Sequence, residues 1–263
     1  TVLKAGIFLD VENLSRNGGW GMRYDVLREL VQAQGAIVVR ANAYLAVDRE
    51  REQEDEDARQ RGEEYRNAIR RTGFHLIPKE VLRYRDSKGE LVTKANADLD
   101  LAVEALLQAD NLDYVLLGTG DGDFLRLVRA LQSRGKRVDL LSFANTSRLL
   151  RQEVDYYFSG FLVPGLVTDG QNGDKKKRGV MYSVNEAKGY GFLSVRTGFG
   201  PTDFQADIFL HIRDFTRNEE NVDNAHFALL KTREAILQFE LEQQAGGRLK
   251  AINAAEFQFA RPS

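Results

Sequence analysis

The sequence predicts an α/β protein with a parallel sheet, followed by a small all-β barrel. Through residues 1–163, short apolar runs alternate with helical patterns of apolar residues. Strands that alternate with helices need crossover connections, which favour a parallel sheet covered by helices. Beyond residue 178 the pattern changes to short strand-like pieces separated by Gly, Asn and Asp. A chain of 263 residues with 43% hydrophobic residues is long enough for one large domain or two modest ones.

In the first part, each expected strand is a short apolar run and each expected helix has apolar residues at helical spacing. Strands are expected at residues 5–10, 37–44, 74–78, 114–119 and 138–143. Helices are expected at residues 24–34, 49–71, 97–108, 123–133 and 147–153. The helix at 97–108 is expected to bury a face formed by Leu99, Ala102, Val103 and Leu106. The helix at 49–71 is dense in Arg and Glu, which is typical of a solvated, salt-bridged helix.

The second part begins after a change in composition. Residues 164–178 are predicted to form a linker, because the stretch DGQNGDKKKR at 169–178 is polar, glycine-rich and ends in four bases. Strands are then expected at 179–195, 207–212, 235–242 and 248–254. The predicted domains are therefore 1–163 and 179–263.

Composition excludes several classes of protein. The absence of cysteine removes disulfides and thiolate metal sites. The net charge of -2 argues against binding to nucleic acid through bulk charge, although local patches and a bound cation can outweigh the mean. No apolar run approaches the ~18 residues of a membrane span, and the first residues lack the pattern of a secretory signal. We therefore expect a cytoplasmic protein with no membrane partner.

Sequence motifs of several common enzyme classes are absent. The stretch GTGDG at 118–122 does not fit the dinucleotide-binding pattern G-x-G-x-x-G, and no P-loop pattern G-x-x-x-x-G-K-[ST] occurs. No nucleophile elbow of the form G-x-S-x-G occurs either.

Acidic residues follow two of the expected strands and begin one of the expected helices. Asp10 ends the first strand, with Asn13 shortly after it, and Asp121 and Asp123 follow the strand at 114–119. Asp98 and Asp100 lie at the start of the helix at 97–108, where the helix dipole favours a carboxylate. In an open parallel sheet, ligands bind outside the carboxyl ends of the strands. The sequence therefore predicts an acidic cluster at this edge, with Asp100 weaker than Asp98 because it shares a helix face with Glu104.

Converging carboxylates repel one another unless a cation lies between them. Mg²⁺ and Mn²⁺ prefer hard oxygen ligands and can polarise a phosphoryl oxygen. We therefore expect Mg²⁺ or Mn²⁺ as cofactor, held by Asp10, Asp98, Asp121 and Asp123, and we expect Gly118, Gly120 and Gly122 to allow a tight turn and close approach of a ligand. The alternative is that each aspartate is only a helix N-cap and Asn13 only a turn residue.

Three blocks of the first part resemble the signature blocks of the NYN domain, a PIN-like nuclease family. They are FLDVEN at 8–13, KANADLDLAVE at 94–104 and GTGDGDF at 118–124. The resemblance implies a Rossmann-like fold and a Mg²⁺- or Mn²⁺-dependent ribonuclease, with the same four aspartates at the metal and Asn13 beside them. It also implies a phosphate contact by Lys94, although four positions separate Lys94 from Asp98 where the family usually has three, and a structural role for Asp155.

The second part places aromatic residues at two-residue spacing. KGYGFL at 188–193 puts Tyr190 and Phe192 on one face of a strand, after Lys188, and DIFLHI at 207–212 does the same for Phe209 and His211. Aligned rings on an exposed sheet stack well on bases; the alternative is that they form the core of a small barrel.

Together the two segments resemble the paired RNA-binding motifs of a cold-shock domain, an OB-type barrel. The sequence departs from that pattern at Ser183, where a stacking Trp is usual, and at Ile212, where a Phe is usual.

These observations lead to one hypothesis and several rivals. We expect an endoribonuclease that cleaves RNA phosphodiester bonds, with a barrel that binds single-stranded nucleic acid. The first rival is an adaptor that binds RNA without cleaving it. The second is a metal-dependent phosphatase that acts on nucleotides. For the barrel itself, a protein-docking role is the other reading. RNA is the expected partner, and self-association into a homo-oligomer is left open.

Overall fold

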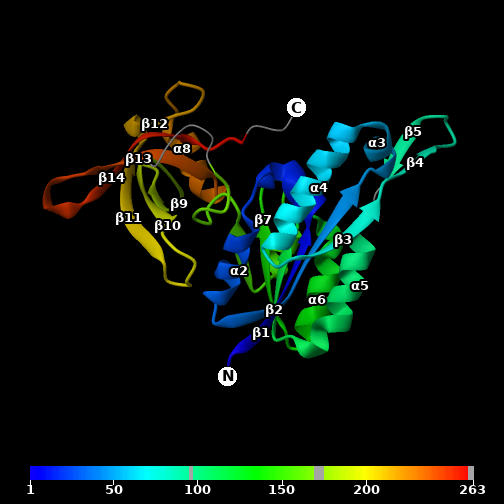
Figure 1. Ribbon diagram of the computed structural model, residues 1–263. Coiled ribbons are helices and arrows are strands. Elements are labelled where there is room, and N and C mark those ends of the chain that lie inside the picture. Colours follow the sequence, from blue (N-terminus) through cyan, green and yellow to red (C-terminus); the bar gives the residue numbers. More distant parts are fainter. Residues whose placement is uncertain (95–96, 169–174, 260–263) are drawn as a thin grey trace. The chain divides into compact units, whose positions relative to one another are not determined.

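The structure, a computed structural model, describes residues 1–94, 97–168 and 175–259 (Figure 1). It divides into two compact units, Thr1–Gly160 and Phe161–Ala260. The second unit starts slightly before the predicted boundary at residue 163. Residues 169–174, in the middle of the predicted linker, lie outside the described residues, and the first barrel strand begins at Lys176, inside the predicted linker.

A six-stranded parallel sheet forms the centre of the first unit. Its strand order is β3-β2-β1-β6-β7-β8, and every neighbouring pair is parallel. The strands are β1 (Leu3–Asp10), β2 (Ala36–Val47), β3 (His75–Glu80), β6 (Tyr114–Gly118), β7 (Arg137–Ser142) and β8 (Tyr156–Ser159). Five of them were predicted, because β1, β6 and β7 are almost wholly buried apolar runs. This sheet confirms the predicted α/β class.

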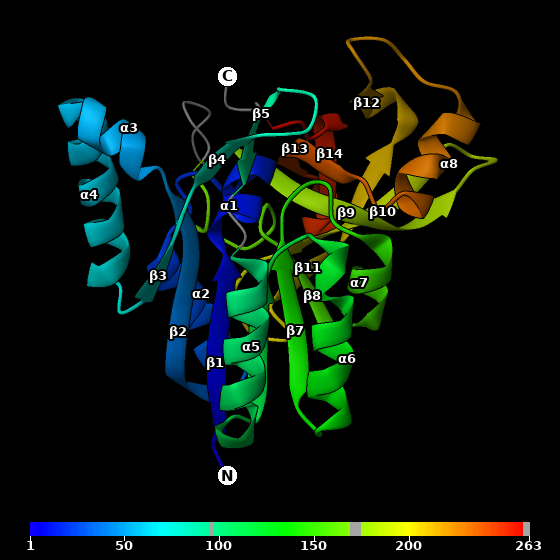
Figure 2. The same cartoon turned by 90° about the vertical axis from the view of Figure 1, so that its right-hand side faces the viewer.

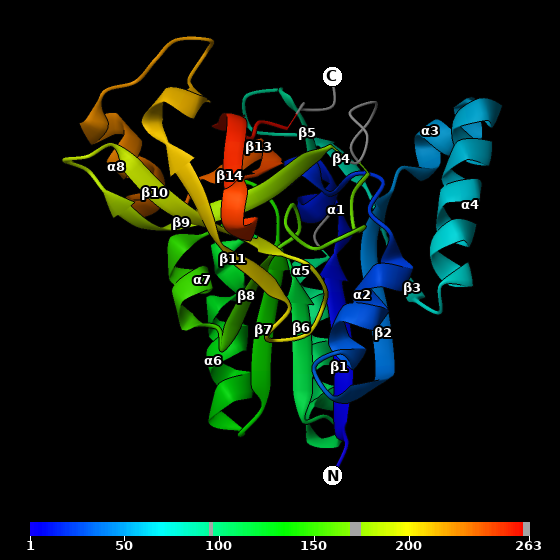
Figure 3. The ribbon, with the colours of Figure 1, turned by 90° about the vertical axis from the view of Figure 1, so that its left-hand side faces the viewer.

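Helices cover both faces of this sheet. Helices α5 (Asp98–Gln108) and α6 (Leu125–Ser133) lie in front of it in Figure 2, whereas α2 (Tyr24–Gln32) lies on the opposite face, seen in Figure 3. The shorter helices are α1 (Val11–Leu14), the π-helical turn η1 (Ser15–Gly19), the 3₁₀ turns η2 (Ala109–Asn111) and η3 (Gly122–Phe124), and α7 (Arg148–Glu153). Such a doubly covered parallel sheet leaves the ends of its strands as the place for a ligand.

Helix α5 buries a different face from the one predicted. Leu101 and Ala105 are fully buried, whereas Leu99 is 67% and Val103 is 44% exposed. Ala102 and Leu106 are partly buried against the core. The prediction was wrong because α5 is apolar on most of its circumference, so spacing alone does not identify which side meets the sheet.

The long helix predicted at 49–71 is two helices, α3 (Arg49–Glu54) and α4 (Glu56–Arg71). The backbone of Asp55 is extended, and its side chain accepts a hydrogen bond from the amide of Ala58. An aspartate in this position is a good N-cap, and it stops the first helix as it starts the second. The prediction also lacked β8 and the hairpin of β4 (Leu82–Arg85) and β5 (Leu91–Lys94).

The second unit contains a closed five-stranded barrel. Its strands are β9 (Lys176–Asn185), β10 (Tyr190–Arg196), β11 (Phe204–His211), β13 (Ile236–Gln243) and β14 (Leu249–Glu256), and the β11–β14 pairing closes the barrel. The short strand β12 (Phe215–Thr216) extends β14, with the 3₁₀ turns η4 (Ile212–Asp214) and η5 (Ala245–Gly247) at strand ends. The barrel is OB-like, as predicted.

Helix α8 (Asn224–Thr232) makes this unit more than the all-β structure predicted. Its residues Phe227 and Leu230 join the barrel core with Leu193, Leu210 and Leu237. The helix lies in the segment between β12 and β13, for which no helix was predicted.

Within the described ranges, every helix is too short or too polar to cross a membrane.

Candidate functional site

The acidic residues lie where the order of the parallel strands reverses. Strand β1 pairs with β2 on one side and β6 on the other, so the chain crosses from one half of the sheet to the other between β1 and β6. Asp10 is the last residue of β1, and the loop that holds Asp121 follows β6. This is the position in the fold where ligands of parallel sheets bind.

Asp10 is buried and held by two neighbours. Only 7% of the residue is exposed, and its carboxylate accepts hydrogen bonds from the amide of Asn13 (3.2 Å) and from the hydroxyl of Thr119 (3.1 Å). Burial raises the pKa of Asp10 from 3.8 to about 6, and the nearby charge of Asp98 adds to this rise. Asp10 caps helix α1, as the alternative reading expected, but a cap alone does not require a buried carboxylate next to further acids.

Asn13 joins the β1 end to the loop after β6. Its side-chain oxygen accepts a hydrogen bond from the amide of Gly120 at 2.7 Å. Its backbone oxygen accepts one from the side chain of Asn17, which in turn is bonded by Asn145. Asn13 is thus a positioning residue in this structure, and it holds two of the acid-bearing segments in register.

Asp98 brings a third segment to the same place. Burial raises the pKa of Asp98, and the charges of Asp121, Asp123 and Glu12 raise it further. Asp98 and Asp123 also line one groove of about 560 Å³ between α5 and α6. Asp98 therefore lies close enough to interact electrostatically with each of the other three predicted aspartates.

Two other acids of the same helix are engaged elsewhere. Asp100 pairs with Lys79 at 3.0 Å. Glu104 accepts hydrogen bonds from the side chains of Tyr44 and Asn42, and this contact with burial raises the pKa of Tyr44. Both are therefore engaged away from the four aspartates. The side chain of Lys94, the predicted phosphate contact, lies outside the described part of the structure.

The glycines of the loop after β6 serve packing rather than a left-handed turn. A Cβ on Gly118 would lie 2.5 Å from a methyl of Leu9, and one on Gly122 would lie 2.9 Å from the hydroxyl oxygen of Ser147. Neither these two nor Gly120 has a positive φ. The need for glycine at 118 and 122 therefore comes from neighbouring side chains of the protein, and the close approach of a ligand stays a prediction.

The donor set suits a hydrated magnesium or manganese ion. No three His, Asp or Glu side chains among residues 1–94, 97–168 and 175–259 form a ready-made metal cage. Mg²⁺ usually keeps several waters and is bound by one or two carboxylates together with substrate phosphates. Asp10 and Asp98, whose pKa values are raised by burial and by neighbouring carboxylates, fit that mode of binding at a place where a phosphate would supply further oxygens.

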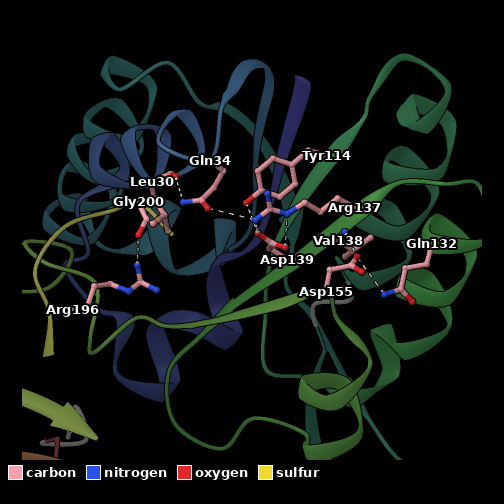
Figure 4. A network of polar contacts seen from close by, with 10 residues as sticks. All are labelled: Leu30, Gln34, Tyr114, Gln132, Arg137, Val138, Asp139, Asp155, Arg196 and Gly200. Carbon is pink, nitrogen blue, oxygen red and sulfur yellow. Dashed lines mark hydrogen bonds and ion pairs between the residues drawn. The ribbon is translucent and has the colours of Figure 1, made fainter. Parts of the chain in front are cut away.

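Not every aspartate at the sheet has this character. Asp139, which is fully buried, accepts hydrogen bonds from Tyr114 (2.7 Å) and from Arg137 (2.6 Å), as Figure 4 shows. Asp155 accepts one from the amide of Val138 at 2.7 Å. These carboxylates have donors of their own and tie β7 to its neighbours, which agrees with the structural role inferred for Asp155.

The barrel presents its aromatic residues on the outside. Tyr190, Phe192, Phe209 and His211 are partly exposed, whereas residues that alternate with them on the same strands, such as Leu193 and Leu210, are buried in the core. Ring centroids lie 5.6 Å apart for Tyr190 and Phe209, 5.9 Å for Phe192 and Phe209, and 6.4 Å for Phe209 and His211. The alternative, that these rings form the barrel core, is wrong.

The departures from the cold-shock pattern lie beside this surface. Ser183 on β9 is opposite Phe192 and is exposed, so a ring is missing at that position. Ile212 packs against the barrel core. Lys188 is exposed in the turn before Tyr190, where it adds a positive charge to the rim. The surface is therefore a smaller aromatic platform than the sequence pattern would provide in full.

Two residues near the acidic edge were not singled out from the sequence. Glu12 raises the pKa of both Asp10 and Asp98 by its charge, and Thr119 bonds Asp10 and the amide of Asp121. Their positions, two residues after the first aspartate and directly after β6, are the signals that could have identified them.

A parallel sheet with carboxylates gathered at its switch point is typical of a hydrolase that acts on phosphate esters. The family model of the NYN domain matches residues 4–162. The chain therefore belongs to the NYN domain family, within the PIN-like nuclease superfamily.

A comparison with curated proteins finds no significant match. Among solved structures, the chain is similar to a protein of unknown function from Vibrio parahaemolyticus. The two share 27% identity over 60% of this chain and 93% of the other, with a TM-score of 0.49.

Proposed function

We propose that this protein is a metal-dependent endoribonuclease. The observation that carries the proposal is the acidic cluster of Asp10, Asp98, Asp121 and Asp123, which brings together three segments far apart in the chain. Buried or mutually repelling carboxylates are unfavourable for folding, and a divalent cation with a phosphodiester would relieve that repulsion.

The residues of the cluster have distinct parts in this proposal. Asp10, fixed by Thr119 and the amide of Asn13, would be a direct metal ligand. Asp98 and Asp123, which line the groove between α5 and α6, would face the substrate side. A bound Mg²⁺ or Mn²⁺ would polarise the scissile phosphate and lower the pKa of the attacking water.

The barrel would hold single-stranded RNA. Its outer rings offer flat surfaces for bases, and each stacked base contributes about 1–3 kcal/mol to binding. Because stacking tolerates any base, this surface would bind RNA with little sequence preference. In this proposal the barrel binds RNA through its rings and not through bulk positive charge, which agrees with the net charge of -2 for the chain.

A cleavage assay on a circular single-stranded RNA tests the activity, because only an endonuclease cuts a chain without ends. In Mn²⁺, the wild type is expected to linearise the RNA, and Asp121→Asn is expected to lower the rate by about 100-fold or more. Asp110→Asn is a matched control that removes the same charge from an exposed carboxylate beside Arg134.

Other outcomes contradict the proposal. Equal residual activity in the wild type and Asp121→Asn would show an adaptor that binds RNA without cutting it. Release of inorganic phosphate from nucleotides, with intact RNA, would show a phosphatase.

A further inference from the structure

A second recess, with a volume of about 580 Å³, opens beside the acidic cluster. It starts at Val11 and Glu12, directly after Asp10, and continues along Leu45–Val47, at the end of β2. The far wall is formed by α4, through Gly62 and Tyr65. Since Glu12 acts electrostatically on both Asp10 and Asp98, this recess adjoins the site of the proposed chemistry.

The most exposed large ring of the described structure stands at its mouth. Trp20 is 67% exposed and stacks on Tyr65, with ring centroids 5.6 Å apart and an angle of 17° between the ring planes. Tyr65 is itself held by a contact between its hydroxyl and that of Tyr24 (3.2 Å). One face of Trp20 is therefore supported by Tyr65, and most of the remaining ring is open to solvent.

The segment directly before Trp20 is anchored to the loop after β7. The backbone oxygen of Asn17 accepts a hydrogen bond from the amide of Ala144 at 2.9 Å, and the side chain of Asn145 donates one to that of Asn17, also at 2.9 Å. Gly19 is buried against Phe143, where a Cβ would lie 2.6 Å from the ring. A tryptophan that packs on one neighbouring ring and leaves most of its surface in water is unfavourable for solubility, which favours a binding role.

The wall of α4 is shaped by an internal glycine. Gly62 lies in the middle of the helix, where glycine is about 1 kcal/mol less favourable than alanine. A Cβ there would lie 2.5 Å from the carboxylate of Glu52, which pairs with Arg66 at 2.7 Å. The glycine thus lets this largely buried ion pair pack against the helix and form the wall.

Cations at the rim complete the recess. Arg51 and Arg61 line it and are exposed, and neither makes an ion pair with any described residue. Arg16 also lines it, paired with Glu12. A flat ring, an apolar floor of Leu45 and Val47, and exposed guanidinium groups that form no ion pair with a described residue match a nucleotide: a base to stack and a phosphate to neutralise.

We propose that this recess binds one nucleobase of the RNA, stacked on Trp20, next to the phosphate at the acidic cluster. This inference rests on the proposed function for the identity of the ligand. It assigns to the helices α3 and α4 the task of binding the nucleotide beside the scissile bond, where the sequence favoured a solvated, salt-bridged helix and left open that its arginines guide the RNA backbone. Arg51 and Arg61 would contact its phosphate.

Tryptophan fluorescence tests this binding without any need for catalysis, because Trp20 is the only tryptophan of the chain. The full-length Asp121→Asn variant is titrated with a single-stranded RNA of about eight nucleotides. Stacking of a base is expected to quench the emission in a saturable way, and an abasic ribose-phosphate oligomer of the same length is expected not to. No quenching by the RNA, or equal quenching by the abasic oligomer, would overturn the inference.

A second measurement uses the active protein. Trp20→Ala is expected to lower kcat/KM for RNA cleavage by at least about fivefold, and Trp20→Phe is expected to retain most of it. Leu107→Ala is a control, because this residue is also exposed and lies at the end of α5 opposite to Asp98. An unchanged kcat/KM in Trp20→Ala would contradict the inference even though the nuclease proposal stands. If RNA quenches the fluorescence of Trp20 but the wild type does not cut RNA, the nuclease proposal is rejected and the proposal that the recess binds a nucleobase stands.

Discussion

The acidic edge of the sheet and the aromatic face of the barrel are built on opposite principles. The edge gathers Asp10, Asp98, Asp121 and Asp123 from segments more than a hundred residues apart, and burial together with neighbouring carboxylates raises the pKa of Asp10 and of Asp98. The barrel face takes its rings from two adjacent antiparallel strands, where Phe192 pairs with Phe209 and Tyr190 with His211. The edge stores unfavourable interactions that a ligand would relieve, whereas the face offers surface that is stable without one.

The same contrast exists within the first unit. Burial raises the pKa of Asp139 as it does that of Asp10, but Asp139 is paired with the guanidinium of Arg137, whereas the charged neighbours of Asp10 are the carboxylates of Asp98 and Glu12. Burial of a carboxylate therefore does not by itself mark a functional site. The charge of the neighbouring side chains distinguishes the two cases. A cation beside the carboxylate indicates a structural role, and further carboxylates indicate a site for a cation.

The largest stability effect is expected where a buried carboxylate loses its charge. Asp139→Asn should lower the free energy of unfolding by about 3 kcal/mol, because it leaves the guanidinium of Arg137 without its partner. Urea denaturation of the variant measures this, with Asp110→Asn as the exposed control. A loss below about 1 kcal/mol would show that the two classes of aspartate differ less than we infer.

In contrast to Asp139→Asn, the substitution Asp10→Asn is expected to raise the free energy of unfolding of the metal-free protein near neutral pH. Its pKa is raised from 3.8 to about 6 by burial, so the folded state binds this proton more tightly than the unfolded state. The group has no cost below pH 3.8, and its ionisation destabilises the folded state progressively as the pH rises to about 6. The total is about 3 kcal/mol at 1.36 kcal/mol per pKa unit.

The measurement is the free energy of unfolding in EDTA, from pH 4.5 to 7, for the wild type and Asp10→Asn. The wild type should lose stability relative to the variant as the pH rises through this window. A constant difference between the two proteins would contradict the raised pKa.

The smallest effect is expected on the barrel. Replacing Tyr190 and Phe209 together by alanine should weaken RNA binding by about tenfold or more, since stacking contributes about 1–3 kcal/mol per base. Fluorescence anisotropy of labelled RNA at fixed salt measures the dissociation constant. Phe204→Ala is a control, because this exposed ring of β11 packs beside Arg196. Among the described residues it makes no ring contact with the aromatic residues Tyr190, Phe192, Phe209 and His211. An unchanged dissociation constant in the double variant would contradict RNA binding by these rings of the barrel.

The sequence predicted those features that depend on the local pattern. Buried apolar runs identified β1, β6 and β7, and the acids after β1 and β6 identified the site, because parallel strands bring their carboxyl ends to one edge. Two-residue spacing likewise placed Tyr190 and Phe192 on one face.

Features that depend on which surfaces meet were not predictable in this way. The hairpin β4–β5 has strands of only four residues, and all of β4 is exposed, so its short alternation of apolar and polar residues faces no core. The recess at Trp20 could not be predicted, because its partner Tyr65 follows 45 positions later and meets it only through the placement of α4. The break at Asp55 could have been read from its N-cap residue, but the long run of Arg and Glu hid it.

The most direct test of the account is a crystal of the full chain soaked in Mn²⁺. Anomalous density is expected among Asp10, Asp98, Asp121 and Asp123, with the ion bound directly by one or two of these carboxylates and by water. The absence of density there, or its presence only at surface acids such as Asp110, would contradict the claim that these aspartates form a cation site.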